Sequence, residues 1–422
     1  MEKTAANLSI IKGHMNSKIL TNNQATNTQK LRPIDDVWES LKMDDSLSKE
    51  KIEMRKKTRS FMESIEQELV EYSNKAEFPH HQLPNLAKLG INGLQLKDQG
   101  HPGLTSAEMG AMLYEMSKID MSIATFYLSH NCLAMSVIGF LGSEAQKQKI
   151  LPDCQTLKKI ISFGLTEPEH GSDASNLKTS AKKVEGGYIL NGSKRWIGNA
   201  TFADYIIIWA KNEADKNKIQ AFIVEKGSQG FKAEKIENKY SARINQNAMV
   251  TLENVFVPDD NKLAKAEDFS YTNLILEHSR ICVAWTATGI AVGAYEAALK
   301  YVLQRKQFGK QIAAFQSTQL KLSRMLAQCE MMVTLCMRTS QLLDESNTTI
   351  GQIGRAKAIC SATAREVCAT ARELCGGNGI LLENRVMKNM LDMESVHTGE
   401  GTYEINMLVS GREITAGISA FK

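Results

Sequence analysis

The sequence lacks several patterns that would each assign a class of protein. Its eight cysteines are scattered and none forms a Cys-x-x-Cys pair, so neither a zinc site nor a thioredoxin-type pair is indicated. No dense Lys/Arg block with interleaved aromatic residues occurs, so nucleic acid is not an expected partner. The N-terminal stretch to Arg32 holds one acid, Glu2, and no long apolar core, so it is not a secretory signal.

The N-terminal segment 1–44 has two explanations. Few acids together with Lys3, Lys12 and Lys18 give it a weak similarity to a mitochondrial transit peptide, whereas a flexible basic tail has the same composition. The last residues, Ser419-Ala-Phe-Lys422, are not a peroxisomal SKL-type signal. We therefore expect the mitochondrial matrix as the compartment, with the peroxisome as the alternative.

Hydrophobic periodicity divides the rest of the chain into three domains: 45–160 helical, 161–268 β-rich and 269–422 helical. The pattern predicts helices over 46–75, 106–140, 273–304, 313–345 and 350–375. It predicts strands over 205–210, 221–225 and 250–257, and a hairpin over 188–197 with Asn191-Gly192 as its turn. The apolar run 123–142 is long enough for a membrane span, but His130 and Asn131 favour a buried helix. The predicted fold class is mostly α with a central β domain.

The stretch Phe163-Gly-Leu-Thr-Glu-Pro-Glu-His-Gly-Ser-Asp-Ala-Ser175 lies where the helical pattern changes to the β pattern. Pro168 and Gly171 predict sharp bends. Free backbone N–H groups and short hydroxyls in such a loop suit a polar ring or a phosphate. An ordinary turn between two domains explains the stretch equally well.

Three further motifs have both a functional and a structural explanation. Arg305-Lys-Gln-Phe-Gly309 follows a predicted helix, where a guanidinium suits a phosphate or is merely solvated. Gly376-Gly-Asn-Gly379 ends a helix, either as a tight turn or where a ligand approaches the backbone. Glu400 lies between two glycines and can act as a base in a dry site, or can be an exposed loop carboxylate. Arg280 and Arg412 can balance its charge, or can be surface residues.

Together these motifs resemble the acyl-CoA dehydrogenase and oxidase superfamily from about Asp45 to Phe421. The resemblance is carried by Leu165-Thr-Glu-Pro with Gly171-Ser-Asp, Arg195-Trp-Ile-Gly-Asn199, Arg305-Lys-Gln-Phe-Gly, Leu374-Cys-Gly-Gly-Asn-Gly and Glu400-Gly-Thr. Within it the chain is most similar to the plant peroxisomal short-chain acyl-CoA oxidase and glutaryl-CoA dehydrogenase branch. That likeness rests on Lys75-Ala-Glu-Phe-Pro79, Gly142-Ser-Glu-Ala-Gln146, Thr201-Phe-Ala-Asp204 and Arg412-Glu-Ile-Thr415.

The resemblance implies a helical domain, a middle β-barrel and a C-terminal four-helix bundle, with FAD as cofactor and no metal. It implies that FAD is bound by Phe163, Leu165, Thr166, Gly171, Ser172, Trp196, Ile197, Gly198, Arg305, Phe308, Gln316, Glu373, Leu374, Gly376, Gly377, Thr402 and Glu404. The group from Arg305 to Gly377 would bind the FAD of a neighbouring subunit, so a homodimer or homotetramer is expected. Substrate would contact Ser172, Arg280, Gly401 and Arg412.

The implied reaction is α,β-dehydrogenation of an acyl-CoA thioester. Glu400 would remove the α proton and the β hydride would pass to flavin N5. The Glu400 N–H and a flavin hydroxyl would hold the thioester oxygen.

Three positions depart from the family pattern. Gly399 replaces the usual Tyr before the base, so the acyl preference is open. Gly198 stands where many dehydrogenases have Thr. Ala124 stands where glutaryl-CoA dehydrogenases carry an Arg, which disfavours a dicarboxylic substrate because its carboxylate would be buried without a partner.

We expect a dehydrogenase for short or branched acyl chains that passes electrons to an electron-transfer flavoprotein. Two alternatives stay open: an oxidase that uses O2, and a weakly active member that serves as an assembly or scaffold protein. Gly399 supports the last of these.

Overall fold

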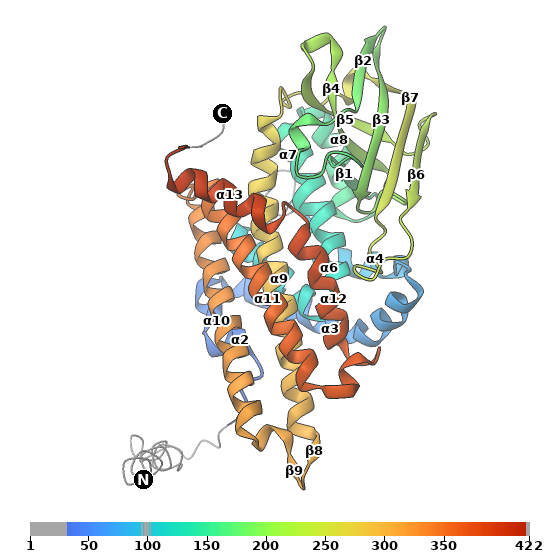
Figure 1. Ribbon diagram of the computed structural model, residues 1–422. Helices are drawn as coiled ribbons and strands as arrows, with labels where there is room; N and C mark the ends of the chain where they lie inside the picture. The colour runs from blue at the N-terminus through green and yellow to red at the C-terminus, as the bar shows by residue number, and fades with distance from the viewer. Residues whose placement is uncertain (1–31, 94–95, 97–100, 102, 419–422) are drawn as a thin grey trace. The chain divides into compact units, whose positions relative to one another are not determined.

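The computed structural model describes residues 32–93, 96, 101 and 103–418. Residues 1–31 of the expected tail and the terminal residues 419–422 lie outside this part. From Asp36 onward the chain forms one compact unit. Its order of helical domain, β domain and helical domain confirms the predicted fold class (Figure 1).

The flexible tail expected over residues 1–44 was predicted to end too late in the chain. Residues from Asp36 to Asp44 are folded, with a short helix α2 (Val37–Ser40) whose N-cap is Asp36. Trp38 is fully buried, and its ring lies 5.2 Å from that of Tyr114 and 6.0 Å from that of Trp285. This burial of a large aromatic side chain fixes the segment, and hydrophobic periodicity could not show it in so short a helix.

The N-terminal domain is helical from α2 to α8. Its further helices are α3 (Lys49–Lys75), α4 (Leu83–Ala87), α5 (Ser106–Ile119), α6 (Met121–Tyr127), α7 (Ser136–Leu141) and α8 (Glu144–Gln155). The expected single helix over 106–140 is broken at Asp120, which caps α6 by accepting a hydrogen bond from Ile123 N. Between α6 and α7 the segment Leu128–Met135 is a π-helix.

The middle domain, expected as a β-barrel, is a curled sheet of seven strands. They are β1 (Ile161–Gly164), β2 (Ser180–Val184), β3 (Gly187–Ile197), β4 (Tyr205–Asn212), β5 (Lys218–Glu225), β6 (Phe231–Lys235) and β7 (Ala248–Pro258). The order is β1-β4-β2-β3-β7-β6, and β5 pairs with β4. Strand β4 pairs with β1 and β2 in parallel and with β5 antiparallel.

The predicted hairpin at 188–197 is wrong, because β3 continues straight through Asn191-Gly192. The pairing of β3 with β7 shifts register between Leu190 and Gly192, which marks a bulge. The Asn191 carboxamide accepts from Asn254 N on β7 at 2.8 Å. The turn between β2 and β3 lies instead at Gly186, where φ is +75°.

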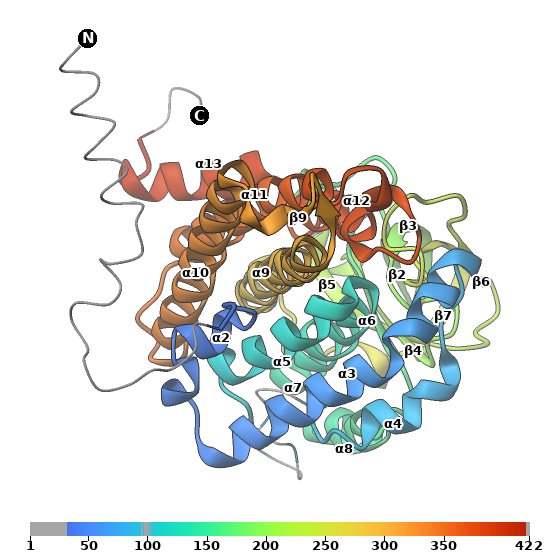
Figure 2. The same cartoon turned by 90° about the horizontal axis from the view of Figure 1, so that it is seen from below.

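The C-terminal domain consists of three long helices and two shorter ones. They are α9 (Ser270–Gln304), α10 (Gln316–Asp344), α11 (Ile350–Leu374), α12 (Arg385–Thr398) and α13 (Tyr403–Ile414). The short strands β8 (Lys306–Gln307) and β9 (Lys310–Gln311) form a hairpin between α9 and α10. Viewed from below, α9 runs between α5 and the helices α10, α11 and α12 (Figure 2).

Two stretches in the described chain have the length and apolarity of a membrane span, 121–141 and α9. However, 83% and 89% of their most apolar windows are buried inside the fold. This burial agrees with the expected buried helix at 123–142.

The contact between α5 and α9 depends on glycines that bring the two backbones together. A Cβ at Gly289 would lie 2.5 Å from the Tyr114 carbonyl oxygen, and one at Gly293 would lie 2.1 Å from that of Lys118. Because these atoms belong to the backbone, α5 would have to move to admit a side chain. Helix α9 is thereby fixed against the N-terminal domain.

We predict that Gly293→Ala lowers the free energy of unfolding by about 1–3 kcal/mol, because the added methyl group overpacks the α5–α9 contact. The matched control is Gly411→Ala in the last turn of α13, where no atom lies within 4 Å of an added Cβ. The free energy of unfolding of this control should rise by up to about 1 kcal/mol. Urea unfolding followed by circular dichroism measures both, and equal changes would contradict the assigned packing.

Candidate active site

The loop after β1 is held in place by one buried carboxylate, Glu167. It accepts hydrogen bonds from Lys178 N at 2.6 Å and from Thr179 N at 2.9 Å and Oγ1 at 2.6 Å. The Lys194 ammonium on β3 lies 2.8 Å from the same carboxylate and also donates to Leu165 O at 3.0 Å. The loop is therefore tied to β2 and β3, and its Leu165 and Thr166 are fixed.

Burial would raise the pKa of the Glu167 carboxyl group, but the Lys194 ammonium and the hydrogen bonds outweigh burial and lower this pKa to about 2. Glu167 is thus ionised at neutral pH. The negative charge of Glu167 therefore stabilises the loop in the folded protein.

The residues expected to face the flavin lie together on this side of the β domain. Phe163 belongs to β1 and is half-buried, Leu165 is buried, and Gly171 and Ser172 are exposed with open space beside Gly171. Arg195 N donates to Thr166 O at 2.8 Å, which brings the end of β3 against the loop. Phe163 is joined to β4 by its ring contact with Trp209.

The segment from Trp196 to Asn199 has unusual backbone geometry. Trp196 and Asn199 both have φ of +66°, a region that costs a non-glycine residue about 1–3 kcal/mol. The Trp196 side chain is half-exposed whereas Ile197 is buried. Gly198 O accepts from Ser162 Oγ at 2.8 Å, so the segment is anchored to β1. Such strain in a well-anchored segment beside an exposed aromatic ring indicates a binding surface.

Glu400 lies in the turn between α12 and α13 and has φ of +54°. The buried Lys357 ammonium of α11 donates to His397 O at 2.8 Å and to Gly401 O at 2.7 Å. The Asn406 carboxamide donates to Gly401 O at 2.8 Å and to Thr402 O at 3.0 Å. These bonds satisfy carbonyl groups on both sides of the turn and hold Glu400 in its left-handed conformation.

The Glu400 carboxylate faces the first half of α9. Ser279 Oγ donates to Glu400 Oε2 at 2.7 Å. The adjacent Arg280 is 8% exposed, and its Nε and Nη1 have no hydrogen-bond partner among the described residues. Burial lowers the pKa of the Arg280 guanidinium, and the nearby Glu400 charge opposes this shift. A buried guanidinium with unmet donors beside a carboxylate fits a polar ligand between them.

The β domain and the Glu400 turn are connected by the loop 236–247. Ala242 N donates to Asp392 Oδ1 at 2.8 Å and Ser241 Oγ to Ser395 Oγ at 2.8 Å, both on α12. Asn247 Nδ2 donates to Trp196 O at 3.3 Å. The loop therefore links the backbone of Trp196 to α12, the helix that ends just before the Glu400 turn.

A second group of predicted residues lies at the other end of α9 (Figure 1). It comprises Arg305, Phe308, Gln316, Glu373, Leu374, Gly376 and Gly377. Asn378 Nδ2 donates to Tyr301 Oη at 3.0 Å, and Lys321 pairs with Glu373 at 2.6 Å, so the ends of α9, α10 and α11 meet there. Phe308 is 93% exposed, and added Cβ atoms at Gly376 and Gly377 would meet open space.

Of the remaining predicted residues, Gly401 lies in the turn and Thr402 caps α13 by accepting from Ile405 N. Glu404 is exposed in the first turn of α13, where hydrogen bonds from its own backbone N–H and from Thr402 lower its pKa. Arg412 is exposed in the last turn, and in the described part of the chain no ion pair joins it to Glu400. Its predicted role near the base therefore stays a prediction.

Sequence reasoning missed four groups of the site: Ser279, Lys357, Asn406 and the Glu167–Lys194 pair. Ser279 is next to Arg280, and Lys194 is next to Arg195 of a recognised motif. Glu167 lies inside the motif Leu165-Thr-Glu-Pro. These neighbours are the only local sequence signal for the missed residues. Lys357 contacts the turn through the tertiary fold alone, whereas Asn406 binds carbonyl groups five and four residues before it in a position that no motif marks.

The site shows how these residues would fit FAD and an acyl-CoA. Trp196 offers an exposed ring, Gly171 open space, and Arg280 unmet donors. Among the described residues, no group of three or more His, Cys, Asp or Glu side chains could hold a metal ion. All eight cysteines are free and buried.

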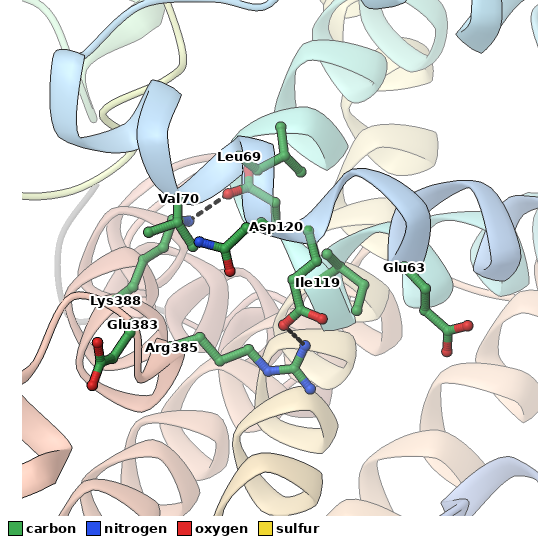
Figure 3. A pocket seen from close by; sticks show the side chains of 10 residues that line it. Glu63, Leu69, Val70, Ile119, Asp120, Glu383, Arg385 and Lys388 are labelled. Atoms are coloured by element: carbon green, nitrogen blue, oxygen red, sulfur yellow. Dashed lines mark hydrogen bonds and ion pairs between the residues drawn. The ribbon is translucent and has the colours of Figure 1, made fainter.

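A separate cavity of about 200 Å³ lies between α3 and α12 (Figure 3). Its cations are paired: Arg385 with Glu66 at 2.8 Å, and Lys388 with Asp120 at 2.7 Å. None of the predicted site residues lines it. These ion pairs cross-link the N-terminal domain to α12.

We predict that Glu167→Gln destabilises the protein by about 3–5 kcal/mol, because it leaves the buried Lys194 charge unpaired. Urea unfolding at pH 7 measures this loss, and the double variant Glu167→Gln/Lys194→Met should recover part of it. The pKa of Glu167 is depressed in the folded state, so its contribution is present above about pH 4.5 and is lost as the pH falls toward 2. In Glu167→Gln the free energy of unfolding should therefore fall less steeply between about pH 4.5 and pH 2 than in the wild type. If the two pH dependences are the same, Glu167 is not the group that stabilises the fold.

Three domain families match the chain in the expected order. They are the acyl-CoA dehydrogenase N-terminal domain over residues 48–158, the middle domain over 162–255 and the C-terminal domain over 269–415. The probable acyl-CoA dehydrogenase YngJ of Bacillus subtilis is 33% identical over 346 residues, 80% of this chain and 90% of YngJ. The caffeyl-CoA reductase-Etf complex subunit CarC of Acetobacterium woodii is 33% identical over 366 residues, 85% of this chain and 96% of CarC.

Two solved structures are similar to this chain over most of its length. A glutaryl-CoA dehydrogenase from Mycobacterium smegmatis in complex with FADH2 superposes with a TM-score of 0.88 at 29% identity, over 92% of this chain and 99% of that one. Butyryl-CoA dehydrogenase from Megasphaera elsdenii superposes with a TM-score of 0.83 at 31% identity, over 87% of this chain and 99% of that one. The chain belongs to the acyl-CoA dehydrogenase family, as an FAD-dependent oxidoreductase that acts on acyl-CoA.

Proposed function

We propose that this protein converts a short- or branched-chain acyl-CoA to its trans-2-enoyl-CoA, with Glu400 as the base that removes the α proton. One observation carries the proposal. The Glu400 carboxylate is held in a strained turn next to Arg280, whose buried guanidinium has unmet donors among the described residues. A base beside an unsatisfied cation suits a substrate whose carbonyl oxygen gains negative charge as the proton leaves.

The roles of this chain's residues follow from their positions. Glu400 Oε2 would exchange its bond with Ser279 for contact with the α proton. Lys357 and Asn406 would keep the turn fixed, so that the Glu400 N–H is available to the thioester oxygen. Arg280 would bind a polar part of the substrate near the base. FAD, when bound by the group from Phe163 to Gly198 with Thr402, would accept the hydride from the β carbon.

The proposed chain length rests on two positions. Gly399 has φ of −67° and ψ of 159°, which any residue adopts, and a Cβ there would lie 3.3 Å from Ser395 O. The backbone conformation thus does not require glycine, although a Cβ would be tight against Ser395 O, and glycine places no side chain next to Glu400. Ala124 on α6 is fully buried, so a dicarboxylic acyl group would find no cation at that position.

The electron acceptor that we propose is an electron-transfer flavoprotein. The name of the relative CarC includes an Etf complex, which supports this choice. An oxidase that transfers electrons to O2 is the alternative, as is a weakly active scaffold protein.

We also propose a homodimer or homotetramer. Arg280 and Arg305 lie 25 residues apart on α9, which at 1.5 Å per residue is roughly 37 Å. The group around Arg305 thus lies far from the Glu400 site of its own chain. A second copy would bring it to an FAD. For the compartment we keep the proposal of the mitochondrial matrix, with the peroxisome as the alternative, which localisation of the tagged full chain would test.

The deciding experiment is anaerobic mixing of the FAD-loaded protein with acyl-CoAs from butyryl to palmitoyl, and with isovaleryl- and glutaryl-CoA. Loss of flavin absorbance with a short or branched substrate supports the proposal. Rapid reoxidation when air is readmitted would favour the oxidase. Bleaching by none of them would support the scaffold protein.

We predict that Glu400→Gln keeps FAD but is reduced by substrate at least 100-fold more slowly, because the amide cannot accept the α proton. Stopped-flow absorbance measures the rate. Glu394→Gln, which removes an exposed carboxylate six residues earlier on α12, is the comparison for a nearby lost charge. Normal reduction of Glu400→Gln would remove Glu400 as the base.

We predict that Gly399→Tyr narrows the range of acyl chains that reduce the flavin, because the ring would occupy the room beside the base. Gly399→Ala separates the effect of the ring from that of replacing glycine and should keep the wild-type range. Relative kcat/KM across the acyl-CoA series measures both. An unchanged profile for Gly399→Tyr would show that position 399 does not shape the pocket.

A further inference from the structure

Asn245, in the loop before β7, is a buried amide without hydrogen bonds from its side chain. It is 1% exposed, and neither Nδ2 nor Oδ1 has a partner among the residues that the structure describes. A buried carboxamide in this state is unfavourable, since each unmet donor or acceptor loses its bond to water. Its backbone is nevertheless held: Asn245 N donates to Ala242 O, and Asn245 O accepts from Lys239 Nζ at 2.7 Å. The fold therefore fixes an unsatisfied polar group in place.

The unmet carboxamide lies beside the backbone of Gly198. A Cβ built on Gly198 would lie 3.7 Å from Asn245 Oδ1 and 2.9 Å from Ser129 Oγ. Ser129 comes from a different domain, in the π-helical segment Leu128–Met135. Within this segment His130 Nδ1 accepts from Ile161 N at 3.2 Å, which holds the π-helix against β1. A π-helical segment often occurs at a functional site, because it redirects side chains that an α-helix would turn away.

Two neutral polar groups from two domains thus meet at a glycine that is flanked by the strained Trp196 and Asn199. A carboxamide offers two donors and an acceptor, and a hydroxyl offers one donor and accepts as well. Neither carries the positive charge that suits a phosphate. Together they suit the edge of a neutral heterocycle in which donors and acceptors alternate. Trp196, two residues before Gly198, has a half-exposed ring that suits its flat face.

We propose that Asn245 and Ser129 bind the polar edge of the isoalloxazine of FAD, as a pair of cofactor-binding residues additional to those named above. The missing side chain at Gly198 lets both groups reach the cofactor. The inference rests on FAD as the cofactor and not on the proposed acyl substrate or electron acceptor.

The test compares full-length variants as apoproteins titrated with FAD. Quenching of flavin fluorescence gives Kd, and the absorption spectrum reports hydrogen bonding to the ring. Asn245→Ala should raise Kd about tenfold and Ser129→Ala about threefold, and both should shift the flavin bands. Asn191→Ala is the matched control: its carboxamide lies on β3 but bonds only Asn254, so Kd should stay at the wild-type value.

A second readout separates cofactor binding from a structural role. Asn245→Ala removes unsatisfied groups, so its apoprotein should melt no lower than the wild-type apoprotein, while the rise in Tm on adding FAD should shrink. A large fall in apoprotein Tm with an unchanged FAD-induced rise would overturn the proposal, as would wild-type Kd and spectrum in both variants. If Asn245→Ala fails to fold, Ser129→Ala decides.

Failure of the proposed function can be distinguished from failure of this inference about FAD binding. A wild-type protein that binds FAD but is not bleached by any acyl-CoA contradicts the dehydrogenase, whereas the ratio of the variant Kd values still decides the role of Asn245 and Ser129.

Discussion

The close contact between α5 and α9 is the constraint on which the site depends. Gly289 and Gly293 let α9 lie against the backbone of α5, so a helix of 35 residues is fixed along its buried length. Its first half presents Ser279 and Arg280 to Glu400, and its end carries the hairpin of β8 and β9. Glu400, the proposed base, comes in contrast from the turn after α12. Small errors in the position of α9 would therefore separate the base from its neighbours, and rigid packing around α9 limits such movement.

The Glu400 turn shows how a costly conformation is stabilised. A glutamate with positive φ is disfavoured by about 1–3 kcal/mol. Lys357 and Asn406 offset this cost by donating to carbonyls on both sides of the turn, and Ser279 binds the carboxylate itself. Burial lowers the pKa of the Lys357 ammonium to about 8, and the Glu400 charge opposes this shift. Lys357 is thus protonated at neutral pH, and its charge lies under the C-terminus of α12, where a cation is favourable.

Much of the fold could be predicted from local patterns, because long periodic segments carry their own signal. The helices α3, α9, α10 and α11 begin and end close to the predicted residues, since their apolar faces are long. The hairpin at Asn191-Gly192 failed because the same dipeptide suits a bulge, and only pairing with β7 decides between them. The folded stretch before Asp44 depends on the burial of Trp38 against two distant rings. In the site, a recognised motif supplied Glu400 and the family resemblance implied Arg280. Lys357 is 43 residues from Glu400 in sequence and contacts its turn only in the fold.

The contact of Ser279 with Glu400 also limits how the base can work. Because the Ser279 hydroxyl donates to Glu400 Oε2, this oxygen is already engaged before substrate binds. Substrate entry would have to break or share that bond while Arg280 gains a partner for its unmet donors. In the proposed mechanism this exchange would favour catalysis, because the new contacts would form where charge develops on the thioester. In the proposed mechanism Ser279 orients the Glu400 carboxylate before substrate arrives, and Arg280 supplies the interaction that substrate completes.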